Sequence, residues 1–359
     1  MGRNRKDGKP SIKWERDVLP EVKRIIVKYV PHIVERLSIR QIYYLLARTI
    51  NPRTTLSHIY ETFGDYQTLD KKLSQWRDGR IRSGSRRGQL STVEIDWKVI
   101  EDIGRRELSG DKGFWNPHGY IEDEIKWLKN LGYHKNHWRL FQPRYVELWT
   151  EKEALTSIIL PYCEQYKVPL IPMRGYSSIT KVFEAFKRFP KDRPIQILHF
   201  GDFDPSGIHA TEKIDSSLKD YNQRFFNGKY TILDVKRIAL VHSQIIQFNL
   251  VPNPKKIDLG SSKKDPNAKR FVQKFKHLPR VSTTKPNEFN SWQLDALEPK
   301  KLIEIVKEAI VNEIDEYLWK LAEREQHEEL EILEEVWDNF DSVFDTLEQD
   351  IKDEYDKLK

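Results

Sequence analysis

The sequence predicts a mixed fold, in which an N-terminal helical domain precedes an α/β domain with a parallel sheet. Apolar residues recur at helical spacing in the first 80 residues, strand-like and helical runs alternate between 143 and 241, and helical patterns return from residue 299. We expect four segments: an N-terminal helix with a helical domain at 1–107, a linker at 108–142, an α/β domain at 143–300 and an acidic helical extension at 301–359.

Charge is distributed unevenly along the chain. The net charge is +6, yet residues 1–90 contain 20 Lys and Arg against 9 Asp and Glu, whereas residues 311–359 contain 5 against 18. A basic body is typical of proteins that bind polyanions, and an acidic tail can shield such a body from nonspecific contacts.

Several classes of protein are excluded by what the sequence does not contain. It has no run of 18 apolar residues, no secretory leader pattern at its N-terminus and a single cysteine, Cys163. We therefore expect a cytoplasmic, nucleoid-associated protein without a membrane span, an internal disulfide or a cysteine-rich zinc site.

Helices dominate the N-terminal domain. Apolar residues recur at helical spacing from Glu15 to Arg36, with Pro31 as an interruption. Ser38 is the predicted N-cap of the next helix, "IRQIYYLLARTI", and two more helices are predicted at 55–62 and 66–79. The arginine-rich stretch that follows is typical of a β-hairpin or a basic loop.

Three short helices followed by a basic hairpin form the pattern of a winged helix, which binds DNA through its third helix. The side chains then available to double-stranded DNA are Lys71, Lys72, Gln75 and Arg77 on that helix and Arg80, Arg82, Arg86 and Arg87 in the hairpin. An ordinary helical bundle explains the helices equally well, and the arginines favour DNA binding.

The second domain alternates strands with helices, which predicts a parallel sheet. Strands are expected at "RYVELW", "KVPLIPM", "IQILHF" and "RIALV", and helices at 151–164, 178–188 and after Gly207. In the acidic extension, apolar residues in steps of three and four predict a short coiled-coil-like seam, formed by Leu333, Trp337, Phe340, Phe344, Leu347 and Ile351. This seam would pack either on the same chain or on a second protomer.

Carboxylates follow two of the predicted strands. Asp202 and Asp204 come just after "IQILHF" in "GDFDPSG", and Glu151 follows "YVELWT". Residues i and i+2 of an extended chain point to the same side, so two carboxylates converge there and repel each other unless a cation lies between them. Mg²⁺ prefers oxygen ligands of this kind, and Mn²⁺ can substitute for it. The sequence therefore predicts a metal site made by Glu151, Asp202 and Asp204.

One Glu after a first strand, a glycine turn in "MRGYSS" and an Asp-x-Asp after a later strand resemble the Toprim arrangement. Within that superfamily, "EKEAL" and "GDFDPSGI" look most like the topoisomerase VI A subunit and its meiotic double-strand-break relative, and "DGRI", "IEDIGR" and "QLDAL" look like stand-alone A-subunit-like proteins of archaeal and bacterial mobile elements. The resemblance covers about 35–260. It implies a winged helix followed by a Toprim domain that binds Mg²⁺.

The resemblance also implies a chemistry. Its tyrosine motif matches "RQIYY", so Tyr44 would attack a DNA phosphodiester and form a 5′-phosphotyrosyl link, with Arg40 stabilising the transition state and Glu151 assisting. Gln41 stands where the family has an acidic residue. In the family the tyrosine and the metal come from different protomers, so a homodimer is implied, and strand passage would require an ATPase partner chain that this sequence does not identify.

Alternatives remain at this point. Tyr43 and Tyr44 are both residues that often fill a core, so Tyr43, Tyr44 or neither is the nucleophile. Without a tyrosine nucleophile, the metal site would activate water, and the protein would be a Toprim nuclease that forms no covalent intermediate. A noncatalytic DNA-binding protein is the third reading. His199 and His209 are expected to be structural histidines.

Overall fold

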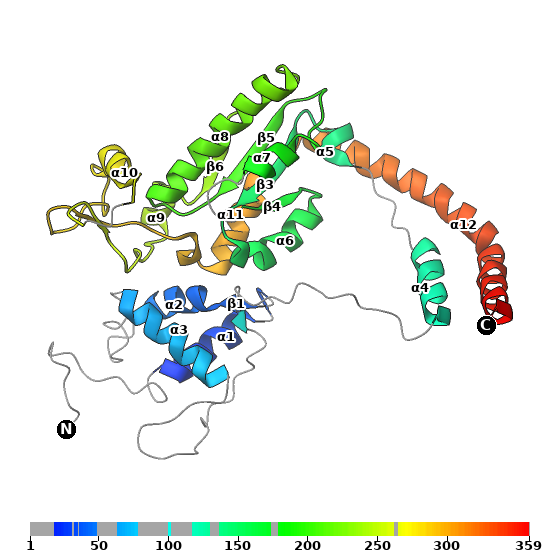
Figure 1. Cartoon of the computed structure of the whole chain (residues 1–359), viewed down its shortest axis with the longest axis horizontal. Coiled ribbons are helices and arrows are strands. Elements are labelled where there is room, and N and C mark those ends of the chain that lie inside the picture. Colours follow the sequence, from blue (N-terminus) through cyan, green and yellow to red (C-terminus); the bar gives the residue numbers. More distant parts are fainter. Residues whose placement is uncertain are drawn as a thin grey trace, which may run out of the picture. The chain divides into compact units, whose positions relative to one another are not determined.

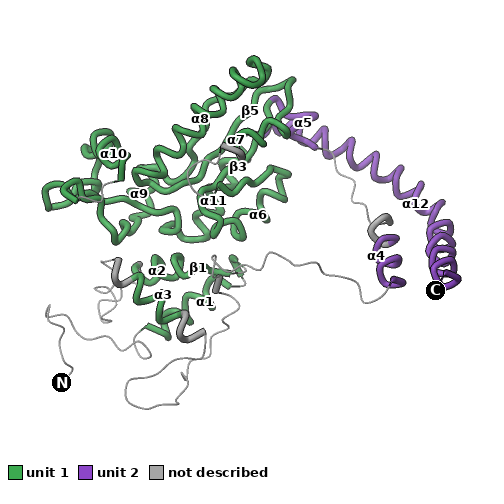
Figure 2. The backbone as a smooth tube through the Cα atoms, in the orientation of Figure 1, with its two compact units in different colours: residues 1–104, 144–313 green, residues 105–143, 314–359 purple. Residues whose placement is uncertain are grey.

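The structure of the chain, a computed structural model, describes residues 18–30, 32–34, 36–48, 63–77, 100–101, 117–129, 136–173, 179–261 and 265–358. It is a mixed α/β structure, mostly helical, with a four-stranded parallel sheet and a long C-terminal helix (Figure 1), as predicted at that level. Two compact units emerge, residues 1–104 with 144–313 and residues 105–143 with 314–359 (Figure 2). No described helix is long and apolar enough to cross a membrane.

The sheet of the first unit is entirely parallel. Its strands are β3 (Tyr145–Thr150), β4 (Leu170–Pro172), β5 (Ile195–Phe200) and β6 (Lys236–Ala239), in the order β4-β3-β5-β6. Every residue of β3 and β5 is buried, as expected for the central strands of a sheet covered on both faces. Thr150 pairs with Phe200, so these two strands end at the same level.

Helices cover the two faces of this sheet. They are η5 (Glu153–Leu155) and α6 (Thr156–Gln165) after β3, α7 (Ile179–Ala185) after β4, α8 (Pro205–Phe226) after β5, and α11 (Pro299–Val311). Because crossovers between parallel strands are right-handed, α6 lies on one face and α7 with α8 on the other. Contacts between α7 and α8, and between α6 and α11, agree with this division.

The strand order reverses beside β3. From β3 the chain moves outward to β4, and then crosses back to place β5 on the other side of β3. The carboxyl ends of β3 and β5 therefore flank a topological switch point, which is where open α/β sheets bind their ligands. The carboxylates predicted from the sequence follow these two strands.

The start of α8 differs from the prediction. The helix begins at Pro205, not after Gly207, and Asp204 is its N-cap, with an Oδ1 that accepts a hydrogen bond of 2.7 Å from the Gly207 backbone N–H. Proline is well suited to the first helical position because its missing N–H has no partner there in any case. Residues 205–207 are thus the first turn of the helix.

Short elements between α8 and α11 bring the chain back to the carboxyl ends of the strands. They are α9 (His242–Gln247), β7 (Ile257–Asp258), α10 (Ala268–Phe275), β8 (Glu288–Phe289) and η6 (Leu294–Ala296). Phe203 forms an antiparallel bridge with Trp292, with backbone hydrogen bonds of 2.8 and 3.0 Å. Phe203, which stands between the two aspartates, is buried.

In the N-terminal part of the first unit, the structure describes α1 (Leu19–Tyr29), β1 (Leu37–Ser38), α2 (Ile39–Arg48), α3 (Phe63–Arg77) and β2 (Ile100–Glu101), which pairs with β1. The helix expected over 15–36 ends at Tyr29, before Pro31. The predicted helix at 55–62 and the arginine-rich hairpin lie outside the described residues, as does most of "MRGYSS".

The second unit contains α4 (Pro117–Lys129), α5 (His137–Leu140) and the 43-residue helix α12 (Glu316–Leu358). α4 packs along the C-terminal half of α12, where Lys352 Nζ donates a 2.6 Å hydrogen bond to Glu122 Oε1 and His118 Nε2 lies 3.0 Å from Asp356 Oδ1. α4 and α5 lie in the stretch predicted to be a linker. The boundaries predicted at 107, 142 and 300 stay predictions.

Candidate active site

The ends of β3 and β5 bring Glu151 against Asp202. The Asp202 backbone N–H donates a 3.2 Å hydrogen bond to Glu151 Oε2, and the Glu151 N–H donates one of 3.0 Å to the Phe200 carbonyl. A Cβ on Gly201 would lie 2.7 Å from Glu151 Oε2, so this position must lack a side chain for the carboxylate to stay where it is. The first two predicted metal ligands are therefore neighbours.

Arg237 holds the loop that carries the two aspartates in place through hydrogen bonds to its backbone. Its guanidinium donates hydrogen bonds to the carbonyls of Gly201 (2.9 Å), Gly207 (3.0 Å) and Leu240 (3.1 Å), and to that of Asp202. Gly207 lies so close to the loop that a Cβ there would be 2.3 Å from the Asp202 carbonyl oxygen. Both glycines of "GDFDPSG" thus stand where a side chain would meet a close neighbour, which is backbone at Gly207 and the Glu151 carboxylate at Gly201.

Negative charge is concentrated at this loop. Burial, together with the charge of Asp202, raises the pKa of Glu151 from 4.5 to about 7. Burial and the same neighbour raise the pKa of Asp204 from 3.8 to about 6. The nearby Arg237 favours the ionised form of both carboxyls, but does not outweigh desolvation and like-charge repulsion. All three predicted metal ligands therefore interact electrostatically, and an added cation would be stabilised among them.

Lys152 supplies a cation on the other side of Asp202. Its Nζ lies 2.9 Å from Asp202 Oδ2 and 3.1 Å from Asp295 Oδ2, and all three side chains are largely buried. Burial alone would lower the pKa of Lys152, but the two carboxylates raise it above its usual value. Lys152 is thus a charged bridge between the loop after β5 and η6.

A short segment, residues 293–294, connects this cluster to the tyrosine of α2. The Leu294 N–H donates a 2.7 Å hydrogen bond to Asp202 Oδ1, and the preceding Gln293 accepts one of 3.0 Å from the Tyr44 hydroxyl through its Oε1. Two adjacent residues therefore contact the predicted metal ligand and the predicted nucleophile within one chain.

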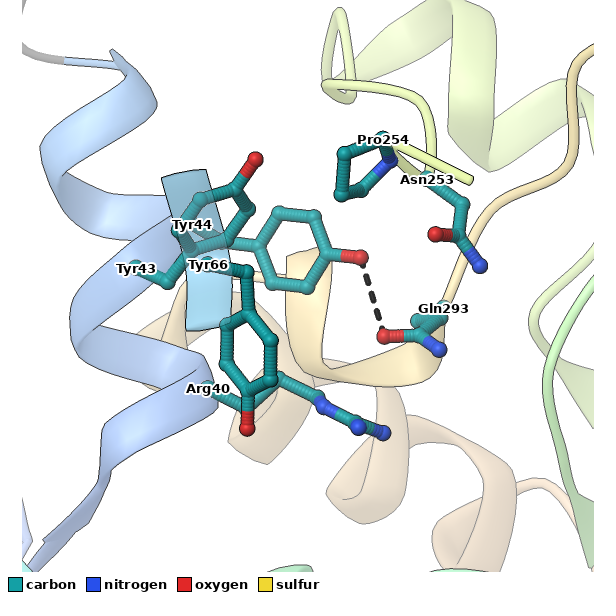
Figure 3. Close-up of a pocket in the computed structure, with 7 residues that line it drawn as sticks. All are labelled: Arg40, Tyr43, Tyr44, Tyr66, Asn253, Pro254 and Gln293. Atoms are coloured by element: carbon teal, nitrogen blue, oxygen red, sulfur yellow. Dashed lines mark hydrogen bonds between the residues drawn. The ribbon is translucent and has the colours of Figure 1, made fainter. Parts of the chain in front are cut away.

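The Tyr44 hydroxyl points into a small cavity of about 20 Å³ (Figure 3). Its lining comes from α2, α3, the segment between α9 and β7 and the residue before η6, and consists of Arg40, Tyr43, Tyr44, Tyr66, Asn253, Pro254 and Gln293. Arg40 lies one turn before Tyr44, as predicted, and its guanidinium is 5.3 Å from the centre of the Tyr66 ring. The cavity has room for about one water molecule.

Tyr44 itself is 2% exposed. Its burial and the charges of Asp295 and Asp202 raise its pKa well above 10, and the nearby Arg40 only partly opposes this. Tyr44 is therefore protonated in the structure as it stands. Deprotonation would require additional positive charge, or a proton acceptor, at this cavity.

The start of α2 explains the glutamine of "RQIYY". The Gln41 N–H donates a 3.1 Å hydrogen bond to Ser38 Oγ, and Gln41 Oε1 accepts one of 2.9 Å from the Ser38 N–H. This is a capping box, and it confirms Ser38 as the predicted cap. The capping box needs a hydrogen-bond acceptor at position 41, and the side chain of Gln supplies one as well as that of Glu would. The start of α2 is therefore intact although the family has an acidic residue at this position. Within the structure, Gln41 Nε2 is buried without a partner.

The three carboxylates have the oxygen atoms that a hard divalent cation prefers. Their side chains do not point to a common centre in this structure. Glu151, Asp202 and Asp204 offer only carboxylate oxygens, which Mg²⁺ and Mn²⁺ prefer, and the raised pKa values of Glu151 and Asp204 agree with incomplete neutralisation of these two carboxyls. As they stand, no group of three or more His, Cys, Asp or Glu side chains in the described ranges is placed to hold a metal ion. Binding would require these side chains to rotate toward a common centre.

The predicted DNA contacts are only partly described. On α3, Lys71 is exposed and Lys72 is half-buried. Gln75 and Arg77 lie in the last turns of α3, and their side chains are outside the described part of the structure. The same is true of the whole hairpin with Arg80, Arg82, Arg86 and Arg87.

Sequence analysis did not select Arg237, Gln293 or Asp295 as site residues. They lie in the segments "RIALV" and "QLDAL", whose patterns do not indicate a place in the site, and only the fold brings them to the strand ends. Lys255 is a further cation near the cavity, because it directly follows Pro254, which lines the cavity. Its side chain is exposed. The sequence signal for that position is the basic stretch "NPKK" at 253–256.

Of the two histidines, His199 is placed as a structural histidine should be. His199 is fully buried, its Nδ1 lies 2.9 Å from Thr211 Oγ1, and burial lowers its pKa to about 3. It is neutral at any physiological pH. His209 lies in the first turns of α8 and lines a small pocket together with Glu212 and Arg270, and its expected structural role stays a prediction.

Comparison with known proteins adds no relative: no protein-family model, no curated protein and no solved structure matches this chain. The kind of protein is therefore described by the geometry of its site alone. It is an α/β protein with a carboxylate cluster at the switch point of a parallel sheet, next to a buried tyrosine and arginine.

Proposed function

We propose that this protein cleaves phosphodiester bonds of double-stranded DNA in a reaction that depends on a divalent metal and uses Tyr44 as nucleophile, as the resemblance to the topoisomerase VI A subunit implies. The observation that carries the proposal is the bridge at 293–294, which contacts both Tyr44 and Asp202. In this proposal the N-terminal region is a winged helix, the α/β region is a Toprim domain and the protein acts as a homodimer.

The roles follow from position. Tyr44 Oη attacks the phosphorus, the 3′ oxygen leaves and takes up a proton, and the 5′ phosphate stays linked to the tyrosine. Arg40 faces the same cavity and stabilises the negative charge that develops on the phosphate. Mg²⁺, when held by Glu151, Asp202 and Asp204, would polarise the phosphate and stabilise the leaving oxygen. Gln293 orients the tyrosine hydroxyl through its hydrogen bond.

One observation favours a second candidate. Tyr44 is buried and its pKa lies well above 10, which makes it a poor nucleophile in the structure as it stands. The carboxylate cluster alone would support a metal-dependent nuclease, in which water attacks the phosphate. That reaction leaves no covalent link between protein and DNA.

Cleavage of supercoiled plasmid with Mg²⁺ or Mn²⁺, stopped with detergent and analysed with and without proteinase, tests the proposal. Wild type would be compared with Tyr44→Phe, Asp202→Ala and the matched control Tyr43→Phe, whose ring contacts Tyr44 at 5.2 Å between centroids. Tyr44→Phe removes one hydroxyl and one hydrogen bond, so it should cost only about 1 kcal/mol of stability. We expect proteinase-sensitive cleavage that disappears in Tyr44→Phe and Asp202→Ala and persists in Tyr43→Phe.

Other outcomes assign other functions. Cleavage that survives Tyr44→Phe but not Asp202→Ala identifies a hydrolytic nuclease. Loss in Tyr43→Phe alone moves the nucleophile to the neighbouring tyrosine. DNA binding without cleavage under any metal condition overturns both proposals and leaves a noncatalytic DNA-binding protein.

A further inference from the structure

A continuous apolar stripe runs along an exposed face of α12. Helical geometry advances about 100° per residue, and six apolar residues fall within one arc about 100° wide. Each exposes between 40% and 63% of its surface; they are Ile332, Val336, Phe340, Val343, Leu347 and Ile351. This α12 stripe is about 30 Å long, at about 1.5 Å of rise per residue. Soluble proteins seldom expose large side chains in such a row without a partner.

The α12 stripe lies beside the face of α12 that α4 covers. The contacts to α4 use Lys352, Tyr355 and Asp356, and helical spacing puts Trp337 and Phe344 on that side as well. The seam predicted from the sequence is therefore divided. Its members Leu333, Trp337 and Phe344 are half-buried, whereas Phe340, Leu347 and Ile351 are exposed and belong to the α12 stripe.

The charge around the α12 stripe is of one sign. Residues 325–351 contain 11 Asp and Glu and no Lys or Arg. Helical spacing places Glu328, Glu335 and Asp350 along one border of the stripe. In paired helices the residues that flank the apolar seam face those of the partner, so their charges select which partner binds.

We propose that the α12 stripe binds an amphipathic helix of a partner protein, with apolar side chains at steps of three and four that are flanked by Lys and Arg. Such a helix covers the exposed apolar surface and sets basic residues against the acidic border. A second copy of α12 would bring acidic residues against acidic residues. An anionic lipid surface would repel the same helix. The inference rests on exposure and charge and is independent of the proposed cleavage.

A synthetic peptide pair tests this inference on the full-length protein. Both peptides are helices of about four heptads with Leu at positions a and d; one carries Lys and the other Glu at positions e and g. Binding is measured by fluorescence anisotropy. The test variant is the double substitution Phe340→Asp with Leu347→Asp, and the matched control is Tyr317→Asp, which alters a 74% exposed aromatic on the same helix away from the stripe. Circular dichroism checks that all variants are folded.

We expect the Lys peptide to bind wild type roughly tenfold or more tightly than the Glu peptide, and to lose affinity as salt increases. The double variant should lose roughly tenfold or more of this affinity, whereas Tyr317→Asp should change it less than about twofold. Absence of binding, equal binding of both peptides, or an unaffected double variant would overturn the inference. So would a wild-type dimer that dissociates in the double variant while the Lys peptide fails to bind, because the occupant would then be a second copy of the chain.

Discussion

Lys152 Nζ lies 2.9 Å from Asp202 Oδ2, in the immediate surroundings of the carboxylates that are proposed to hold a metal ion. The same nitrogen is 3.1 Å from Asp295 Oδ2. Asp202 is therefore neutralised by a residue that directly follows another proposed ligand, Glu151. This arrangement lets the cluster fold without a bound cation, and it makes Lys152 a competitor for the charge of Asp202.

Replacement of Lys152 should separate these two effects. Lys152→Met leaves two buried carboxylates without their cation, so the free energy of unfolding in EDTA should fall by about 3 kcal/mol. Addition of Mg²⁺ should raise the melting temperature of Lys152→Met more than that of wild type, because Asp202 is then free to ligate. Thermal denaturation with and without Mg²⁺ measures both effects, and Lys152→Arg, which keeps the charge, is the control. Equal responses to Mg²⁺ in Lys152→Met and wild type would contradict this account.

The raised pKa values predict how stability depends on pH in the absence of metal. The folded protein holds protons on Glu151 up to about pH 7 and on Asp204 up to about pH 6, whereas the unfolded chain releases them near 4.5 and 3.8. Their contribution to stability is therefore fully present below those lower values and is lost as the pH rises through about 6 and 7. The free energy of unfolding in EDTA should fall by more than about 1 kcal/mol between pH 5 and pH 8 on account of Glu151 alone.

Glu151→Gln isolates this contribution. The variant keeps the shape of the side chain and an oxygen that can accept the hydrogen bond from the Asp202 N–H. It should be more stable than wild type at pH 8, and the difference should shrink toward pH 5. Urea denaturation at a series of pH values measures the difference, and parallel curves for the two proteins would show that Glu151 does not titrate in this range.

The two glycines of "GDFDPSG" should respond differently to alanine. At Gly207 the new Cβ would lie 2.3 Å from the Asp202 carbonyl oxygen, so the backbone must shift, and we expect a loss of about 3 kcal/mol or more, or failure to fold. At Gly201 the nearest atom, at 2.7 Å, is the carboxylate end of Glu151, which can rotate away. Gly201→Ala should therefore keep a melting temperature within a few degrees of wild type.

Gly201→Ala should nevertheless weaken Mn²⁺ binding by roughly tenfold, since one proposed ligand is displaced. Titration calorimetry measures this binding directly, independently of any cleavage. Unchanged Mn²⁺ affinity would mean that Glu151 is not a ligand. The pair of variants thus distinguishes a residue needed for the fold from one needed for the site.

Much of the α/β region could be predicted from the sequence because its signals are local. Short apolar runs such as 195–200, bounded by turn residues, favour central strands of a covered sheet, and the alternation of strands with helices implies parallel order. The same logic placed Glu151 and Asp202 together, since both follow neighbouring strand ends. Ser38 was found as a cap because the capping box lies within four residues.

The remainder of the site depends on contacts between residues far apart in the chain. Asp295 and Gln293 reach the strand ends because Trp292 bridges Phe203, and no local pattern at 290–297 indicates that pairing. Arg237 is the second residue of a strand, and its guanidinium donates to the carbonyl of Leu240 close by and to three carbonyls between residues 201 and 207, which are distant in the sequence. The helical seam of α12 was predicted as one surface, but α4 covers only part of it.

Tyr44 lies close to the proposed metal ligands of its own chain, and this leads to a prediction about the proposed dimer. The resemblance implies that the tyrosine of one protomer works with the metal of another. In this structure, however, the Tyr44 hydroxyl donates a hydrogen bond to Gln293 of the same chain. The next residue, Leu294, donates one to Asp202, also of the same chain. If the reacting site is built as in this structure, Tyr44→Phe and Asp202→Ala protomers cannot complement each other, because each mixed dimer contains no complete site. We therefore expect an unfolded and refolded mixture of the two variants to remain inactive on supercoiled plasmid. Mixing either variant with wild type controls for subunit exchange, and recovery of proteinase-sensitive nicks in the variant mixture would instead place the tyrosine and the metal in different protomers.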